Sequence, residues 1–96
     1  MAILRFISGE LQGEVIELPR ARVTFGRDLD NMIGTDNPAV SLHHAVIVPE
    51  AGGFVIYDLD SSNGTFVNGE KIKERRLLNG DMVKIGIMEM RYELEG

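Results

Sequence analysis

Short runs in which apolar and polar residues alternate recur along the chain, and turn residues separate them. Alternation over four to eight residues is typical of a half-buried β-strand. The runs are AILRFIS before Gly9, EVIEL before Pro19, RVTFG up to Gly26, HAVIV before Pro49, and then FVIYDL, TFV, KI, MVKIG and MRYEL. Strands of this length at this spacing predict an all-β sandwich or barrel.

One stretch, EKIKERRLL at residues 70–78, has the local propensity of a helix. It is short and lies between two Asn-Gly pairs, which are strong turn signals. We therefore predict strand and loop there. The sequence shows no internal repeat, linker or low-complexity stretch, so it predicts a single domain over residues 1–96.

The amino-acid composition and net charge exclude several classes of function. Hydrophobic residues make up 44% of the chain, as in globular proteins, and there is no cysteine to form disulfides, thiolate zinc sites or a cysteine nucleophile. The net charge of −5 argues against binding to nucleic acid or to anionic membranes. No apolar run reaches the ~18 residues of a membrane span, and no charged-then-apolar leader is visible. We expect a cytoplasmic protein.

The polar residues that interrupt the pattern gather in three segments. They are Gly26, Arg27 and Asp28 in the first; Ser41 and His44 in the second; and Ser61, Ser62, Asn63 and Gly64 in the third. In a sandwich, loops from different strands meet at one end and supply the binding surface. An arginine fork, hydroxyls and an amide that converge there suit an oxyanion such as phosphate. The pattern indicates recognition of an anion.

The segments resemble the forkhead-associated (FHA) domain family. The resemblance rests on FGR at 25–27, SLHH at 41–44, DLDSSNGTFVNG at 58–69 and LLNGDMVKIG at 77–86. Each motif alone is weak, but all of them in order at matching spacing are specific. The resemblance covers about residues 4–94. It implies an eleven-stranded β-sandwich of FHA type that binds phosphothreonine-containing peptides through apical loops.

The resemblance also implies a role for each site residue. Arg27, Ser41 and Ser62 would contact the phosphate, and Asn63 would hold the main chain of the peptide. Gly26, His44, Ser61, Gly64 and Thr65 would support the site. His44 in particular would be a buried brace whose ring hydrogen-bonds the loop backbone. The pair Asn63-Gly64 thus shapes the site, whereas a hairpin turn explains Asn68-Gly69.

The chain departs from the family pattern at Leu42, where many members carry Arg or Asn after the serine. Leucine offers no hydrogen-bond donor, and the same loops carry Asp28, Asp30, Asp36 and Asp60. We expect weaker binding, or a preference for phosphopeptides with flanking Lys or Arg. Two places are expected to set further side-chain preference: Pro38 and Ala39, and the residues near Gly80 in what we expect to be the last apical turn.

Three classes of function remain. The leading one is a phosphothreonine-dependent peptide-binding module in Ser/Thr kinase signalling, with a phosphothreonine-containing protein or peptide as partner and a Ser/Thr kinase upstream. The second is an FHA-like interaction or self-association module that needs no phosphate. The third is a small hydrolase that uses Ser41 or Ser62, His44 and an aspartate, and it lacks a glycine-framed nucleophile turn. We expect no enzyme, cofactor or metal site, because the adjacent His43 and His44 would point to opposite faces of a strand.

Overall fold

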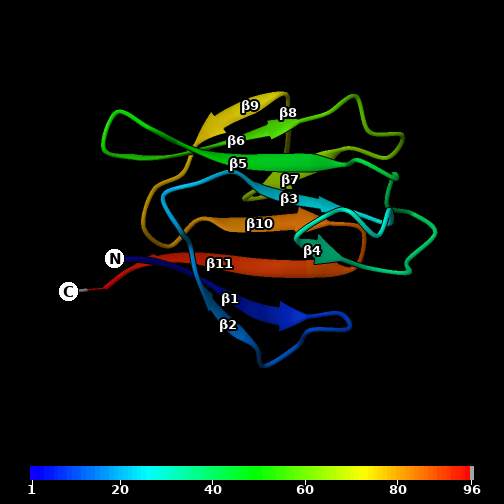
Figure 1. The fold of residues 1–96 in the computed structure, drawn as a ribbon, viewed down its shortest axis with the longest axis horizontal. Helices are drawn as coiled ribbons and strands as arrows, with labels where there is room; N and C mark the ends of the chain where they lie inside the picture. Colours follow the sequence, from blue (N-terminus) through cyan, green and yellow to red (C-terminus); the bar gives the residue numbers. More distant parts are fainter. Residues whose placement is uncertain (96) are drawn as a thin grey trace.

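The computed structural model describes residues 1–95, which fold into two β-sheets packed face to face (Figure 1). Within this range the regular elements are eleven strands, and none of the segments is a helix that could span a membrane. The strands are β1 (Ala2–Ser8), β2 (Val15–Glu17), β3 (Val23–Gly26), β4 (Ile33–Gly34), β5 (Ala45–Glu50), β6 (Gly53–Asp58), β7 (Thr65–Val67), β8 (Glu70–Ile72), β9 (Glu74–Arg76), β10 (Met82–Ile85) and β11 (Met88–Leu94). The predicted all-β sandwich is confirmed.

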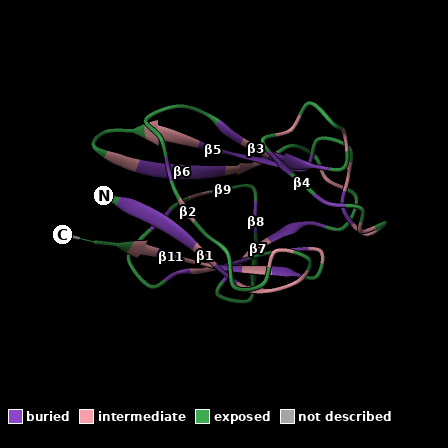
Figure 2. Cartoon of the chain, turned by 60° about the horizontal axis from the view of Figure 1, so that its bottom comes forward, coloured by how far each residue is buried: buried purple, intermediate pink, exposed green. Residues whose placement is uncertain are grey.

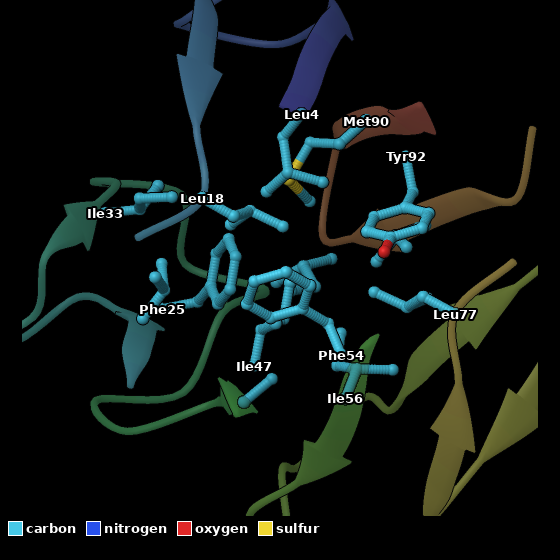
Figure 3. Close-up of a cluster of buried hydrophobic side chains, with 14 of the residues drawn as sticks. Leu4, Leu18, Phe25, Ile33, Ile47, Phe54, Ile56, Leu77, Met90 and Tyr92 are labelled. Carbon is cyan, nitrogen blue, oxygen red and sulfur yellow. The ribbon is translucent and has the colours of Figure 1, made fainter. Parts of the chain in front are cut away.

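The first sheet has the strand order β2-β1-β11-β10-β7-β8, and the second has the order β4-β3-β5-β6-β9. Neighbouring strands are antiparallel except β3 and β4, which are parallel. Because side chains alternate between the two faces of a strand, one face of each sheet is apolar and covers the other sheet. Figure 3 shows part of this core, with Leu4, Met90 and Tyr92 of the first sheet opposite Phe25 and Ile47 of the second.

Residues 70–78 form strand and loop, as predicted, because they supply β8, β9 and the start of the next loop. Two short strands are not among the alternating runs of the sequence. β4 has only two residues, and β9 is the charged segment ERR, so neither shows a recognisable alternation. Their positions depend on pairing with β3 and β6, which is a tertiary effect that local pattern does not report.

The pair Asn68-Gly69 joins β7 to β8 as a hairpin, as predicted. Both residues have positive φ, 52° and 83°, which matches the tight turn that Asn-Gly favours. The turn residue does more than this, however. The Asn68 side chain donates to Asp81 at 2.9 Å and accepts from the backbone N–H of Met82 at 2.9 Å. It therefore also fixes the start of β10.

The sandwich has two distinct ends. The apical loops are the β3–β4 loop (27–32), the β4–β5 loop (35–44) and the β6–β7 loop (59–64), which lie on the right of Figure 1. Figure 2 shows that most of their residues are exposed or half-buried. Both termini and the β9–β10 loop (77–81) lie at the opposite, basal end.

The expected place of Gly80 in the last apical turn is wrong. Gly80 lies in the β9–β10 loop at the basal end, where its N–H donates to the carbonyl of Tyr92 at 2.7 Å. The apical turn of this part of the chain is Gly86-Ile87, between β10 and β11. The Asn-Gly signal identified a turn correctly, but it does not report at which end of a sandwich the turn lies.

Candidate functional site

The end of β3 brings the first two apical loops into direct contact. The backbone N–H groups of Arg27 and Asp28 donate to the carbonyls of Ser41 and Leu42, each at 3.1 Å. A Cβ atom at Gly26 would lie 2.1 Å from the Leu42 carbonyl oxygen, far inside van der Waals contact. Glycine is therefore needed at position 26 because the backbone of the neighbouring loop passes over it.

Arg27 projects from this junction with an exposed side chain. Its Nε donates to the carbonyl of Val40 at 2.5 Å, which fixes the stem of the side chain on the β4–β5 loop. Within residues 1–95 its two terminal nitrogens form no hydrogen bond or ion pair. Arg27 thus presents an oriented pair of NH₂ groups to solvent, which is the arrangement that binds phosphate by two parallel hydrogen bonds.

Ser41 and Ser62 lie side by side at the same place. The N–H of Ser62 donates to the Ser41 hydroxyl oxygen at 3.0 Å, so the Ser41 hydroxyl can donate its own hydrogen outward. Among the described residues, the Ser62 hydroxyl has no partner. Asn63 uses one amide N–H on the Ala39 carbonyl at 2.8 Å and keeps its oxygen and second N–H for another group. The structure brings all four expected contact residues together.

His44 is completely buried and joins the β4–β5 loop to the β6–β7 loop. Its Nδ1 accepts the N–H of Ser41 at 3.1 Å, and its Nε2 lies 2.9 Å from the carbonyl oxygen of Gly64. A carbonyl can only accept, so the proton is on Nε2 and the ring is the neutral tautomer. The ring therefore holds two functional loops by their backbones.

The same contacts are inconsistent with a hydrolytic triad. Both ring nitrogens of His44 are used by backbone groups, and neither contacts a serine hydroxyl in the described range. The carboxylate of Asp58 binds Ser61 and Thr65. A triad requires a nucleophile bonded to the base and the base bonded to an orienting acid, so these residues do not assemble one.

Asp58 organises the β6–β7 loop, a role that the sequence did not reveal. Its carboxylate accepts from the Ser61 hydroxyl at 2.6 Å, the Ser61 N–H at 3.1 Å and the buried Thr65 hydroxyl at 2.7 Å. The Ser61 hydroxyl oxygen in turn accepts the N–H of Gly64 at 3.0 Å. Burial alone would raise the pKa of Asp58, but the hydrogen bonds from Ser61 and Thr65 prevail and lower it.

We expect Asp58→Asn to destabilise the domain at neutral pH by about 1–3 kcal/mol, because an amide nitrogen cannot accept these hydrogen bonds. A lowered pKa in the folded state stabilises the domain above the unfolded-state value of about 4, and this stabilisation is lost as pH falls through the folded-state pKa. The difference between wild type and variant should therefore shrink at low pH. Urea unfolding at a series of pH values measures it.

The matched control is Asp60→Asn. Asp60 is exposed in the same loop and has a φ of 54°, which asparagine tolerates well. This variant should change the free energy of unfolding by less than about 0.5 kcal/mol. Equal losses for the two variants, or a loss for Asp58→Asn that does not depend on pH, would contradict the role given to Asp58.

Two further features of the apical end were missed. Asn31 donates from its side chain to the carbonyls of Asp28 and Leu42 at 2.9 Å and 2.8 Å, so it ties the β3–β4 loop to the β4–β5 loop.

The second feature is that each apical loop exposes a large aliphatic side chain. Leu29 is 99% exposed, and Leu42, Leu59 and, in the β10–β11 turn, Ile87 are 51%, 40% and 54% exposed. Single leucines in polar loops carry no sequence signal for this exposure.

The acidic residues of the β3–β4 loop lie beside His43, whose side chain is exposed. Its ring nitrogens lie 3.6 Å from an oxygen of Asp28 and 3.8 Å from an oxygen of Asp30. One ligand atom from each of the three residues falls within 4.8 Å of the others, the spacing of a possible metal site. All three side chains are accessible to solvent, and such groups often approach one another without an ion. We assign no metal site to them.

Comparison with known proteins gives the family. The family model of the FHA domain matches residues 23–86, and the chain belongs to this family. The chain is 44% identical over 92 residues to the ABC transporter ATP-binding/permease protein Rv1747 of Mycobacterium tuberculosis, covering 96% of this chain and 10% of that protein. It is 41% identical over 83 residues to the transcriptional regulatory protein EmbR of the same species. That match covers 85% of this chain and 21% of EmbR. The chain thus spans only a small part of these relatives.

Solved structures agree with this assignment. The structure of M. tuberculosis EmbR in complex with a low-affinity phosphopeptide superposes with a TM-score of 0.89 at 38% identity, covering 99% of this chain and 24% of that chain. The structure of the FhaA FHA domain complexed with the intracellular domain of Rv3910 superposes with a TM-score of 0.86 at 27% identity. The match covers 97% of this chain and 100% of that chain. A third structure, from a study of phosphothreonine-dependent FHA domain interactions, superposes with a TM-score of 0.87 at 26% identity. The match covers 99% of this chain and 97% of that chain.

Proposed function

We propose that the domain is a phosphothreonine-dependent peptide-binding module that mediates protein–protein interaction in Ser/Thr kinase signalling. The observation that carries the proposal is the convergence of donors at the apical end. Arg27 contributes two NH₂ groups, Ser41 and Ser62 contribute hydroxyls, and the protein itself uses none of these as donors within the described range. They come from three different loops. His44 and Asp58 hold the β4–β5 and β6–β7 loops, and Asn31 ties the β3–β4 loop to them.

The relatives support this proposal. One solved FHA structure contains a phosphopeptide and another addresses phosphothreonine-dependent interactions. A third holds the intracellular domain of another protein, which supports a protein partner. By this proposal the partner of the present domain carries a phosphothreonine, a Ser/Thr kinase acts upstream in the cytoplasm, and the domain acts as a single unit over residues 1–96 without catalysis, cofactor, nucleic acid or membrane.

The energetics predict a strong dependence on phosphate. A phosphothreonine carries about −1.5 to −2 charges at pH 7 and three strong acceptor oxygens. Charge-assisted hydrogen bonds contribute about 1.5–3 kcal/mol each. Loss of two would weaken binding by about 3–6 kcal/mol, or about 10²–10⁴-fold.

The experiment compares fluorescently labelled peptides that differ only in their central residue. A degenerate phosphothreonine pool, the threonine pool and a glutamate pool are titrated with the domain and followed by fluorescence polarisation. We expect saturable binding of the phosphothreonine pool and a loss of at least about 10²-fold for the threonine pool. Glutamate should not restore binding, because one carboxylate provides fewer acceptors and less charge than a phosphate. Equal binding of the three pools would refute the proposal.

A second candidate is supported by the exposed aliphatic side chains at the apical end. Leu29, Leu42 and Leu59 are exposed on the same three loops that carry the donors, and Ile87 is exposed on the β10–β11 turn. Exposed apolar side chains at a binding end are typical of a surface that contacts another protein. The domain would then bind a folded partner, or a second copy of itself, without phosphate. The two candidates differ in their dependence on Arg27, which the first requires and the second does not.

A further inference from the structure

The basal end contains a groove of about 560 Å³ that the apical function does not use. Its floor is apolar and is formed by Leu18, Phe54 and Leu77. Arg20 and Arg76 line the same groove. A concave site of a few hundred Å³, mostly apolar with a few polar groups, has the form of a ligand pocket.

The two arginines are the positive charges of the groove, which Glu17 also lines. Within residues 1–95 neither forms an ion pair with a carboxylate. The guanidinium of Arg20 stacks over the Phe54 ring, 5.3 Å from its centroid. Arg76 donates only to neutral groups, the carbonyls of Glu50 and Ala51 at 3.1 Å and 3.0 Å. In a chain of net charge −5, two unpaired guanidinium groups in one groove are a specific feature.

Tyr92 gives the groove a third polar group. The side chain is only 1% exposed, yet its hydroxyl forms no hydrogen bond with any residue of the described range. Its ring packs edge-on against Phe54 at a centroid distance of 6.4 Å, and Figure 3 shows it beside Phe54 and Leu77. Among the described residues no fully buried side-chain nitrogen or oxygen lacks a partner, so the Tyr92 hydroxyl, which has none, is accessible to solvent. It lines the groove, where an incoming acceptor can reach it.

The positive charges of Arg20 and Arg76 affect the pKa of the Tyr92 hydroxyl. Burial raises the pKa of Tyr92, the positive charges of Arg76 and Arg20 oppose the rise, and the negative charge of Asp81 adds to it. Arg20, Arg76 and Tyr92 all line the same groove, so an anion bound there can approach all three. A carboxylate has four acceptor sites and can receive bonds from a guanidinium and a phenol together.

We propose that the basal groove is a second binding site, which takes an acidic peptide segment with a large apolar side chain next to an Asp or Glu. The carboxylate binds Arg20, Arg76 and the Tyr92 hydroxyl, and the apolar side chain covers Phe54, Leu18 and Leu77. The groove lies at the end of the sandwich opposite the apical loops. One domain can therefore hold a phosphorylated partner and an acidic segment at the same time.

The test uses an NMR titration of the ¹⁵N-labelled domain with the acetylated and amidated peptide SGFEFGS. We expect saturable shifts at the amides of Phe54, Leu77 and Tyr92 and none at Arg27 or Asn63. The peptide SGFQFGS, which lacks the carboxylate, and SGSESGS, which lacks the apolar side chains, should each bind about tenfold more weakly or worse. The probe carries no phosphate, so its result is independent of the function proposed for the apical loops.

Two variants address the contacts. Tyr92→Phe keeps the ring and removes only the hydroxyl, and Arg20→Glu reverses one exposed charge, so each should weaken binding about tenfold in a folded protein. Arg22→Glu makes the same charge change at an exposed residue that does not line the groove, and it should bind as wild type does. Absence of basal shifts at millimolar peptide, equal binding of the glutamine peptide, or basal shifts that depend on protein concentration alone would overturn the proposal. The last result would mean that a second copy occupies the groove.

Discussion

Arg27→Ala is expected to weaken phosphothreonine-peptide binding by about 10²-fold or more, while the domain stays folded. The side chain is exposed, so its removal leaves no cavity in the core. Its loss removes the only NH₂ pair that the described apical loops direct outward without a protein partner. The structural cost is confined to the bond from Nε to the Val40 carbonyl, about 1 kcal/mol. Titration calorimetry, with thermal unfolding as a check of folding, measures both effects.

The controls separate charge from geometry. Arg75→Ala makes the same change in net charge on β9, where the arginine pairs within residues 1–95 with Glu70 alone, and it should bind the peptide as wild type does. Arg27→Lys keeps the charge but loses the planar fork, and it should fall between wild type and Arg27→Ala. If Arg27→Ala and Arg75→Ala weaken binding equally, the phosphate is not held by Arg27.

His44→Leu is expected to cost about 2–5 kcal/mol of stability and to weaken peptide binding as well. The ring is completely buried, and leucine would leave the Ser41 N–H and the Gly64 carbonyl without their partner. Each buried group left unpaired costs about 1–3 kcal/mol. Because Ser41 and Gly64 belong to two different apical loops, both loops lose their common support. Chemical denaturation and peptide titration report the two consequences.

The neighbouring histidine provides the control. His43 is exposed and its contacts with Asp28 and Asp30 are long, at 3.6 Å and 3.8 Å. His43→Leu should therefore change stability by less than about 0.5 kcal/mol. A large loss for His43→Leu, or a small one for His44→Leu, would show that the apical loops are not held together through His44.

Sequence pattern was sufficient for what depends on local chemistry. Alternation located most strands, and Asn68-Gly69 identified its hairpin because both residues adopt positive φ readily. The convergence of Arg27, Ser41, Ser62 and Asn63 followed from motifs in three loops and from the resemblance to the FHA family. Their contact with a ligand remains a prediction.

The rest depends on packing between distant segments. The two-residue strand β4 exists because it pairs with β3, and Gly80 lies at the basal end because β10 runs from that end toward the apical loops. Asp58 is an ordinary strand-end aspartate in the sequence, and only the fold places three donors around its carboxylate. The basal groove combines residues from several strands and loops that have no shared motif.

The most direct test of the central claim is an NMR titration of the ¹⁵N-labelled domain with the phosphothreonine peptide pool, with the threonine pool run beside it. The account predicts saturable shifts at the amides of Arg27, Ser41, Ser62 and Asn63 that occur only with the phosphorylated pool. Absence of these shifts at millimolar peptide, or identical shifts with the threonine pool, would contradict it. The apical donors would then serve a partner that carries no phosphate.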